Sequence, residues 1–150
     1  MIPSLIEAAA VNGDLQQALI ATVEHFGAQA GTIHWMESGG LKLASHWNIP
    51  PPVVALIGSV PVGKGIAGLA AERLEPISIC NIQTDQSGQV RPGAKGTGME
   101  GSVAVPMLVG GVLRGVLGVA KVEAYDWTEE EKQTLLEIGE RLSPRAETAG

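Results

Sequence analysis

Two Gly-Gly pairs, each inside an apolar stretch, constrain the fold of this chain more than any other feature. From Thr32 to Asn48, apolar and polar residues alternate around Gly39-Gly40. The stretch from Gly101 to Lys121 is rich in valine and leucine and is interrupted by Gly110-Gly111. Because glycine readily adopts the positive φ angles of two-residue turns, both stretches predict β-hairpins. The chain should therefore contain an antiparallel sheet.

The hairpins also predict which residues share a face. If the first glycine pair forms the turn, Thr32 lies opposite Trp47, and His34 shares their face. Both faces of this hairpin are apolar enough to be covered, so the sheet is expected to be a middle layer. In the second hairpin, Gly115 and Gly118 leave one strand with little side-chain bulk, which predicts the close approach of another backbone.

Helices are expected at both ends of the chain. A short alanine-rich helix should run from Ser4 to Val11. After Asp14, a typical N-cap residue, apolar residues recur every three or four positions as far as Gly27, which predicts an amphipathic helix. Thr128 and Glu131 have the spacing of a capping box, and the apolar stripe after them predicts a last helix.

The segment between the hairpins predicts short elements and one long loop. A helical turn is expected over residues 53–57, a short helix from Gly65 to Arg73, and a strand from Pro76 to Ile82. Residues 83–99 are rich in glycine, glutamine, aspartate and serine and have no apolar period. A loop of that length inside a compact domain usually serves a function.

The composition excludes several classes of protein. A length of 150 residues, with 45% hydrophobic and 17% charged residues, predicts a single packed domain over residues 1–150. A net charge of −6 argues against nucleic acid, whose phosphates attract clustered lysine and arginine. No apolar run approaches the roughly 18 residues of a membrane span, and the N-terminus lacks a signal-peptide pattern. We therefore expect a cytoplasmic protein with no membrane partner.

The segment Gly63-Lys64-Gly65-Ile66-Ala67-Gly68 matches the dinucleotide fingerprint G-x-G-x-x-G, and Asp85 lies near the expected place of a ribose-binding acid. That fingerprint works in a parallel βαβ unit, whereas the Gly-Gly pairs predict an antiparallel sheet. Two interpretations of the glycines remain open. They could offer free backbone N–H groups to an anionic or polar ligand, or they could let a short helix pack tightly on the sheet.

The order of these elements resembles the GAF domain family. The resemblance covers about residues 12–142, and its blocks are Val60–Ala70, Pro76–Ile82, Ser102–Met107 and Gly115–Val119. It implies an α+β fold with a central antiparallel sheet of five or six strands. The terminal helices would cover one face of this sheet, and short helices with a long loop would cover a ligand pocket on the other.

The resemblance also implies a function and a site. The function is that of a sensory domain that binds an unidentified small molecule, forms a homodimer through its first and last helices, and acts in signal transduction, with a signalling protein as a further partner. No catalytic residue, metal or particular cofactor is implied. The implied ligand-binding residues, with His34 added because it shares their predicted face, are Thr32, His34, Trp47, Asn48, Ile66, Ala67, Asn81 and Asp85.

Cyclic-nucleotide-binding members of the family carry an N-K-x5-F-x3-D-E motif. Here the same spacing gives Ala120-Lys121, Trp127 and Glu131-Lys132, so Lys121 is expected to pair with Glu131. The acid that holds a purine would fall near Gly118, where this chain has no carboxylate. The pattern therefore does not favour a cyclic nucleotide.

Two alternatives to the sensory domain remain. Some small GAF proteins reduce free methionine-(R)-sulfoxide with several cysteines, whereas this chain has Cys80 alone, which we expect to be a small buried hydrophobic residue. A GAF domain without a ligand, which serves only for dimerisation, is the other alternative. Haem and bilin are not indicated, because His25, His34 and His46 assemble no metal pair and no thiol lies where a bilin would attach.

Overall fold

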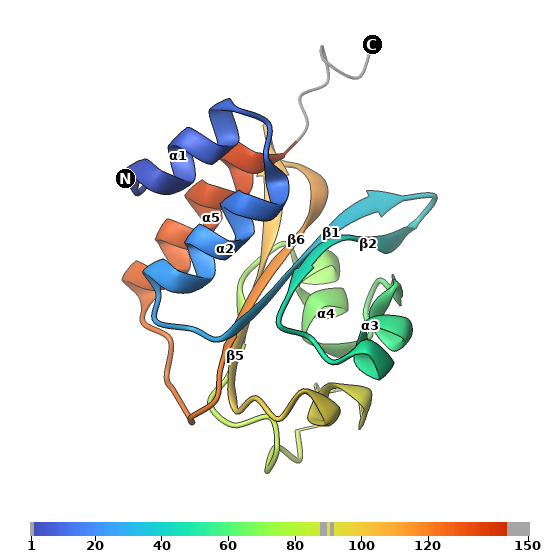
Figure 1. Cartoon of the computed structure of the whole chain (residues 1–150). Helices are drawn as coiled ribbons and strands as arrows, with labels where there is room; N and C mark the ends of the chain where they lie inside the picture. The colour runs from blue at the N-terminus through green and yellow to red at the C-terminus, as the bar shows by residue number, and fades with distance from the viewer. Residues whose placement is uncertain (1, 88–89, 91, 144–150) are drawn as a thin grey trace.

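A six-stranded antiparallel sheet forms the centre of the computed structural model, which describes residues 2–87, 90 and 92–143 (Figure 1). The strand order is β3-β2-β1-β6-β5-β4, so the two predicted hairpins lie side by side through β1 and β6. All pairings within this sheet are antiparallel. The strands are β1 (Ala30–Glu37), β2 (Gly40–Trp47), β3 (Ser59–Pro61), β4 (Ile77–Ile79), β5 (Gly101–Val109) and β6 (Val112–Lys121).

The helices lie on both faces of the sheet. Figure 1 shows α1, α2 and α5 together on one face and α3 and α4 on the other, which confirms the predicted fold class. Their bounds are α1 (Ser4–Val11), α2 (Leu15–His25), α3 (Pro51–Ile57), α4 (Gly65–Arg73) and α5 (Glu129–Leu142). The predicted long loop contains a short 3₁₀ helix, η1 (Pro92–Thr97), and its residues 88, 89 and 91 lie outside the described part of the chain.

The turn of the first hairpin differs from the prediction. Its two central residues are Ser38 and Gly39, with φ angles of 49° and 82°, whereas Gly40 already belongs to β2. A two-residue turn of this type needs a positive φ at both central positions. Serine meets that requirement here, so the turn lies one residue earlier than the glycine pair suggests.

This shift makes the predicted register wrong. Trp47 lies opposite Gly31, and Thr32 lies opposite His46. The earlier turn alone would shift the register by two residues and keep every side chain on its predicted face, whereas a bulge between Ile33 and His34 takes back one of the two. Because neighbouring residues of a strand point to opposite faces, Trp47 and Thr32 lie on opposite faces of the sheet.

The face of the sheet toward α1, α2 and α5 carries the larger core. Each fully buried aliphatic side chain there contributes about 1.5–3 kcal/mol. At the edge of this core, the partly exposed ion pair between Arg141 Nε and Glu7 Oε1, at 2.7 Å, joins α5 to α1. The buried residues of the core include Leu19, Val23, Ile33, Val105, Met107, Leu117, Leu135 and Ile138.

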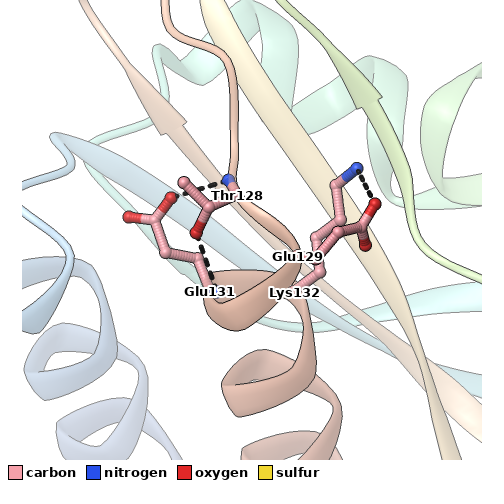
Figure 2. A network of polar contacts seen from close by, with 4 residues as sticks. All are labelled: Thr128, Glu129, Glu131 and Lys132. Carbon is pink, nitrogen blue, oxygen red and sulfur yellow. Dashed lines mark hydrogen bonds and ion pairs between the residues drawn. The ribbon is translucent and has the colours of Figure 1, made fainter.

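The predicted capping box is present at the start of α5 (Figure 2). The Thr128 hydroxyl accepts a hydrogen bond from the backbone N–H of Glu131 at 3.1 Å, and the Glu131 carboxylate accepts one from the Thr128 N–H at 2.9 Å. Two N–H groups that have no partner within the helix are satisfied in this way. An ion pair between Lys132 and Glu129, at 3.7 Å, adds to the same turn.

We predict that Thr128→Ala lowers the free energy of unfolding by about 1 kcal/mol, because the Glu131 N–H loses its acceptor. Urea denaturation of the variant measures the loss. Thr134→Ala, in the middle of the same helix, is the matched control and should change stability by less than about 0.5 kcal/mol. Equal effects of the two substitutions would contradict a capping role.

Lys121 couples β6 to α5 by a different route from the one expected. Its Nζ lies 3.6 Å from the ring centroid of Tyr125 and forms no ion pair with Glu131 among the described residues. The Tyr125 hydroxyl in turn donates to the Glu131 carboxylate at 2.8 Å, which raises the pKa of Tyr125. The expected direct pair is wrong, because an aromatic ring stands between the two charges and attracts the cation to its face.

Candidate functional site

Small side chains line one face of the sheet at its centre. On β1, β6 and β5, residues directly opposite one another share a face. Two rows of such residues face α3 and α4, and their neighbours along each strand point toward the larger core. The rows are Ala30, Ala120 and Ser102, and Thr32, Gly118 and Ala104. We call these six residues the small-residue patch.

A cavity of about 280 Å³ lies over the small-residue patch. This volume is close to the lower end of the range for small-molecule sites, about 300–1,000 Å³. Besides the patch, its lining comes mainly from α3, the start of α4 and the chain on either side of the long loop, and most of it is apolar. The lining side chains outside the patch include His34, Ile49, Val53, Leu56, Ile57, Val60, Lys64, Ile66, Ala67, Ile82 and Met99.

The first turn of α4 forms one wall of this cavity. Lys64 is the N-cap residue, and no side chain caps the helix, so the N–H groups of the first turn have no partner within it. Gly63 has a φ of 92°, and a Cβ on Gly68 would lie 2.5 Å from the Pro61 carbonyl oxygen. Tight packing therefore requires these glycines, and the parallel βαβ context of a dinucleotide site is absent from the described chain.

His34 forms another wall of the cavity and is 2% exposed. Its Nε2 lies 2.9 Å from the Ile57 carbonyl oxygen, so Nε2 carries a proton and donates to the last residue of α3. Nδ1 is buried and has no partner. Burial lowers the pKa of His34 below its ordinary value, although the Ile57 hydrogen bond opposes this shift. The ring is neutral near pH 7 and offers Nδ1 as a hydrogen-bond acceptor.

The lowered pKa of His34 predicts a pH dependence of stability. The unfolded chain takes up a proton on this residue near pH 6.5, whereas the folded chain takes it up only at lower pH. As the pH falls below about 6.5, the free energy of unfolding of the wild type should therefore decrease relative to that of His34→Gln, by at most about 1.4 kcal/mol per pH unit. Above about pH 7.5 the difference in the free energy of unfolding between the wild type and His34→Gln should be constant. Urea denaturation of both proteins measures it, and parallel stability curves across the whole range would contradict the prediction.

Four of the eight predicted site residues line the cavity: Thr32, His34, Ile66 and Ala67. The other four do not. Trp47 lies on the opposite face of the sheet, for the reason given by the corrected register, and is 42% exposed. Asn48 follows it with a φ of 57° and donates from its side chain to the Gln29 carbonyl oxygen at 2.8 Å.

Asn81 and Asp85 shape the start of the long loop and do not line the cavity. The Asn81 side-chain oxygen accepts from the Gln83 N–H at 2.9 Å, and Asp85 accepts from the Ser87 N–H at 3.1 Å. Short polar side chains commonly make such local hydrogen bonds at turns. Most residues of the small-residue patch were not among the site residues predicted from the sequence. The available signal was the alternation of small and large residues in the second hairpin, over 102–105 and 117–120.

Cys80 differs from the expectation of a buried residue. It follows the last residue of β4 and is exposed. Ile77 and Ile79 point into the protein, so Cys80, one position further, points away from it. Local desolvation, together with the charge and hydrogen bond of Asp126, raises the pKa of the Cys80 thiol. The thiol is absent from the cavity lining, and the described residues contain no metal-binding cluster of histidine, cysteine or acidic side chains.

The geometry defines a small domain in which an antiparallel sheet backs a cavity closed by short helices. The family model of the GAF domain matches residues 13–143. The chain therefore belongs to the GAF domain family. No curated protein matches it significantly, and none of the described helices is long and apolar enough to cross a membrane.

Similar solved structures share the fold at low sequence identity. The GAF domain of a phosphoenolpyruvate-protein phosphotransferase from Coxiella burnetii has a TM-score of 0.74 and 20% identity, over 91% of this chain and 88% of that chain. A free methionine-R-sulfoxide reductase from Neisseria meningitidis, solved with its substrate, has a TM-score of 0.75 and 18% identity, over 91% and 81%. The A. aeolicus nlh2 GAF domain has a TM-score of 0.66 and 23% identity, over 93% and 94%. The fold thus occurs both in a free methionine-R-sulfoxide reductase and in GAF domains of other proteins.

Proposed function

We propose that this chain is a sensory GAF domain that binds a small molecule in the cavity over the small-residue patch. The observation that carries the proposal is the cavity itself, about 280 Å³ between the sheet and the α3–α4 side. A core that served only stability would fill such a volume, because each buried void weakens packing. The lining is mostly apolar and includes a few polar residues, among them Thr32, Lys64 and Ser102, as is usual in small-molecule sites.

The same proposal includes a homodimer through α1 and α5, in a cytoplasmic protein that acts on a signalling partner. Leu5 and Val11, both on α1, are 78% and 67% exposed. α1 and α5 are joined by the Glu7–Arg141 ion pair and lie away from the cavity face of the sheet (Figure 1). A second copy would cover these apolar side chains and leave the cavity accessible.

Cys80 supports a binding function over the reductase alternative. A reductase needs a thiolate that can reach the bound sulfoxide. The Cys80 thiol lies outside the cavity lining, and its raised pKa decreases the thiolate fraction near pH 7. A turnover assay on free methionine-(R)-sulfoxide, with Cys80→Ser as control, distinguishes the two functions. We expect no activity, and turnover that depends on Cys80 would show that the chain is an enzyme.

Native mass spectrometry of the purified protein tests binding and dimerisation together. We expect a dimer that carries one small molecule per protomer after exposure to cell extract. A bare monomer from every extract would contradict both parts of the proposal. A bare dimer, with no thermal shift in a metabolite library, would favour the dimerisation module without a ligand.

A further inference from the structure

Charged groups are nearly absent from the cavity lining. Among the described residues, the lining contains no aspartate, glutamate or arginine, and Lys64 is its one lysine. Lys64 is exposed, so its ammonium group can stay hydrated. The walls are apolar and include Val53, Ile66, Ile82 and Met99. A buried cation would find no opposite charge here, and a buried carboxylate would find only an exposed lysine, so either ion would lose hydration without full compensation.

The Thr32 hydroxyl is a polar group that a ligand can reach. Thr32 points to the cavity side of β1, because its neighbour Gly31 faces Leu19 and Val23 of the larger core. Its Oγ1 leans over Gly118 and lies 3.2 Å from the place where a Cβ of that residue would stand. The oxygen is accessible, and no other described residue forms a hydrogen bond with it. It can therefore donate to a ligand, or accept from one, without breaking a contact within the protein.

The other neutral polar side chains of the lining are less available. In His34, Nε2 pairs with a backbone carbonyl of α3, and Nδ1 is buried. The Thr97 hydroxyl accepts from a backbone N–H at 3.1 Å. Ser102 lies on β5, at the opposite edge of the small-residue patch from Thr32. A ligand that lies over the middle of the patch therefore meets Thr32 as its principal polar contact.

The volume of the cavity indicates the size of the ligand. An apolar cavity of about 150 Å³ holds one benzene ring, and this cavity has about 280 Å³. The patch spans three adjacent strands and is therefore about 10 Å wide. Gly118, on the middle strand, has no side chain that would hold a ring away from the sheet. Two fused rings with a short substituent fit these dimensions.

We propose that the ligand is an uncharged, mainly apolar molecule of about two fused rings, which lies over Gly118 and forms a hydrogen bond with Thr32 Oγ1. This inference rests on the proposed function, because it names the chemical class of the molecule that the cavity binds. It also makes Thr32 the residue that recognises the polar group of the ligand.

Three probes of nearly equal size and shape test the charge of the ligand. Near pH 7, 2-acetylnaphthalene is neutral, 2-naphthoate is negative and 2-naphthamidine is positive. Equilibrium dialysis against the full chain gives the dissociation constant of each. We expect the ketone to bind about tenfold or more tightly than either ion, because a buried charge loses hydration without full compensation. Equal or tighter binding of either ion would overturn the inference.

Two further ketones test the size of the ligand. Acetophenone has one ring fewer than 2-acetylnaphthalene and should bind about tenfold more weakly, because it buries less apolar surface. 2-Acetylanthracene has one ring more and should also bind more weakly, because a third ring exceeds the volume of the cavity. If either ketone bound as tightly as 2-acetylnaphthalene, the predicted size would be wrong.

Thr32→Val tests the hydrogen bond, since it removes the hydroxyl and keeps the shape of the side chain. We expect 2-acetylnaphthalene to bind this variant about fivefold more weakly, and 2-ethylnaphthalene, which has no oxygen, to bind it as tightly as the wild type. Thr32→Ser should retain the affinity for the ketone. Thr134→Val, on α5 and outside the cavity lining, is the matched control. Equal losses for both probes would show that Thr32 acts only on the structure and would contradict its role in recognition.

Failure of 2-acetylnaphthalene to bind would overturn the inference. The proposed function would survive that result if native mass spectrometry showed a retained molecule of another class, such as one that is charged near pH 7. An empty protein in both experiments would remove the inference and the proposed function together.

Discussion

Ala67→Phe should abolish ligand binding and leave the fold intact. Ala67 lines the cavity from the first turn of α4, so a phenyl group at this position would occupy space that the ligand needs. We expect affinity to fall by about 100-fold or more, which corresponds to about 2.7 kcal/mol. The melting temperature should stay the same or rise, because the added ring fills a void. Occupancy in native mass spectra and calorimetric titration measure the loss.

Ala55→Phe is the matched control for this prediction. Ala55 lies on α3, is exposed and does not line the cavity. The same substitution there should leave affinity within about twofold of the wild type, because the cavity volume does not change. If Ala67→Phe bound the ligand as tightly as Ala55→Phe, the ligand would lie elsewhere on the protein.

Gly115→Ala should destabilise the protein by about 3 kcal/mol, the largest effect that we expect from a single added methyl group. Gly115 lies on β6 opposite Trp35 of β1, at the centre of the sheet. A Cβ there would collide with the carbonyl oxygen of His34 and would lie 3.1 Å from the Trp35 ring. Backbone cannot move aside as a flexible side chain can, so β1 and β6 would have to separate. The midpoint of urea denaturation measures the change.

Gly40→Ala controls for the effect of adding a methyl group to a strand. A Cβ on Gly40 would have the Val60 carbonyl oxygen as its nearest neighbour, at 3.7 Å, which is ordinary van der Waals contact. We expect this variant to remain within about 0.5 kcal/mol of the wild type. Equal stability of the two variants would show that the approach of β1 to β6 is looser than the structure indicates.

The elements of this fold could be predicted from sequence because their signals are local. The positive φ angles of Gly110 and Gly111 form the second hairpin turn as expected, and the Thr128 capping box starts α5 at the predicted residue. The close approach predicted from Gly115 is also confirmed, since its neighbour is the backbone of His34. In each case a few adjacent residues carry the information.

The register of the first hairpin could not be predicted in the same way. Whether Ser38 or Gly40 shares the turn with Gly39 depends on which pairing best packs the two strands against the rest of the sheet. The bulge beside His34 leaves no trace in the alternation of apolar and polar residues. The missed bulge matters for the site, because without it Trp47 would lie on the face that carries the cavity.

The cavity itself depends on contacts between distant parts of the chain. Thr32, Gly118 and Ala104 become neighbours only when β1 pairs with β6 and β6 with β5. Each residue alone is unremarkable in its strand. Their common small size becomes visible only once the order and register of the three strands are known. Sequence patterns could therefore indicate a pocket on this side of the sheet, but they could not identify the small-residue patch that lines it.

A crystal structure of the protein with the molecule that it retains from cell extract would show directly where the ligand binds. We expect density for that molecule over the small-residue patch, between Thr32 and the first turn of α4. A molecule bound instead at the exposed side chains of α1, or beside Trp47, with the cavity filled by side chains, would contradict it.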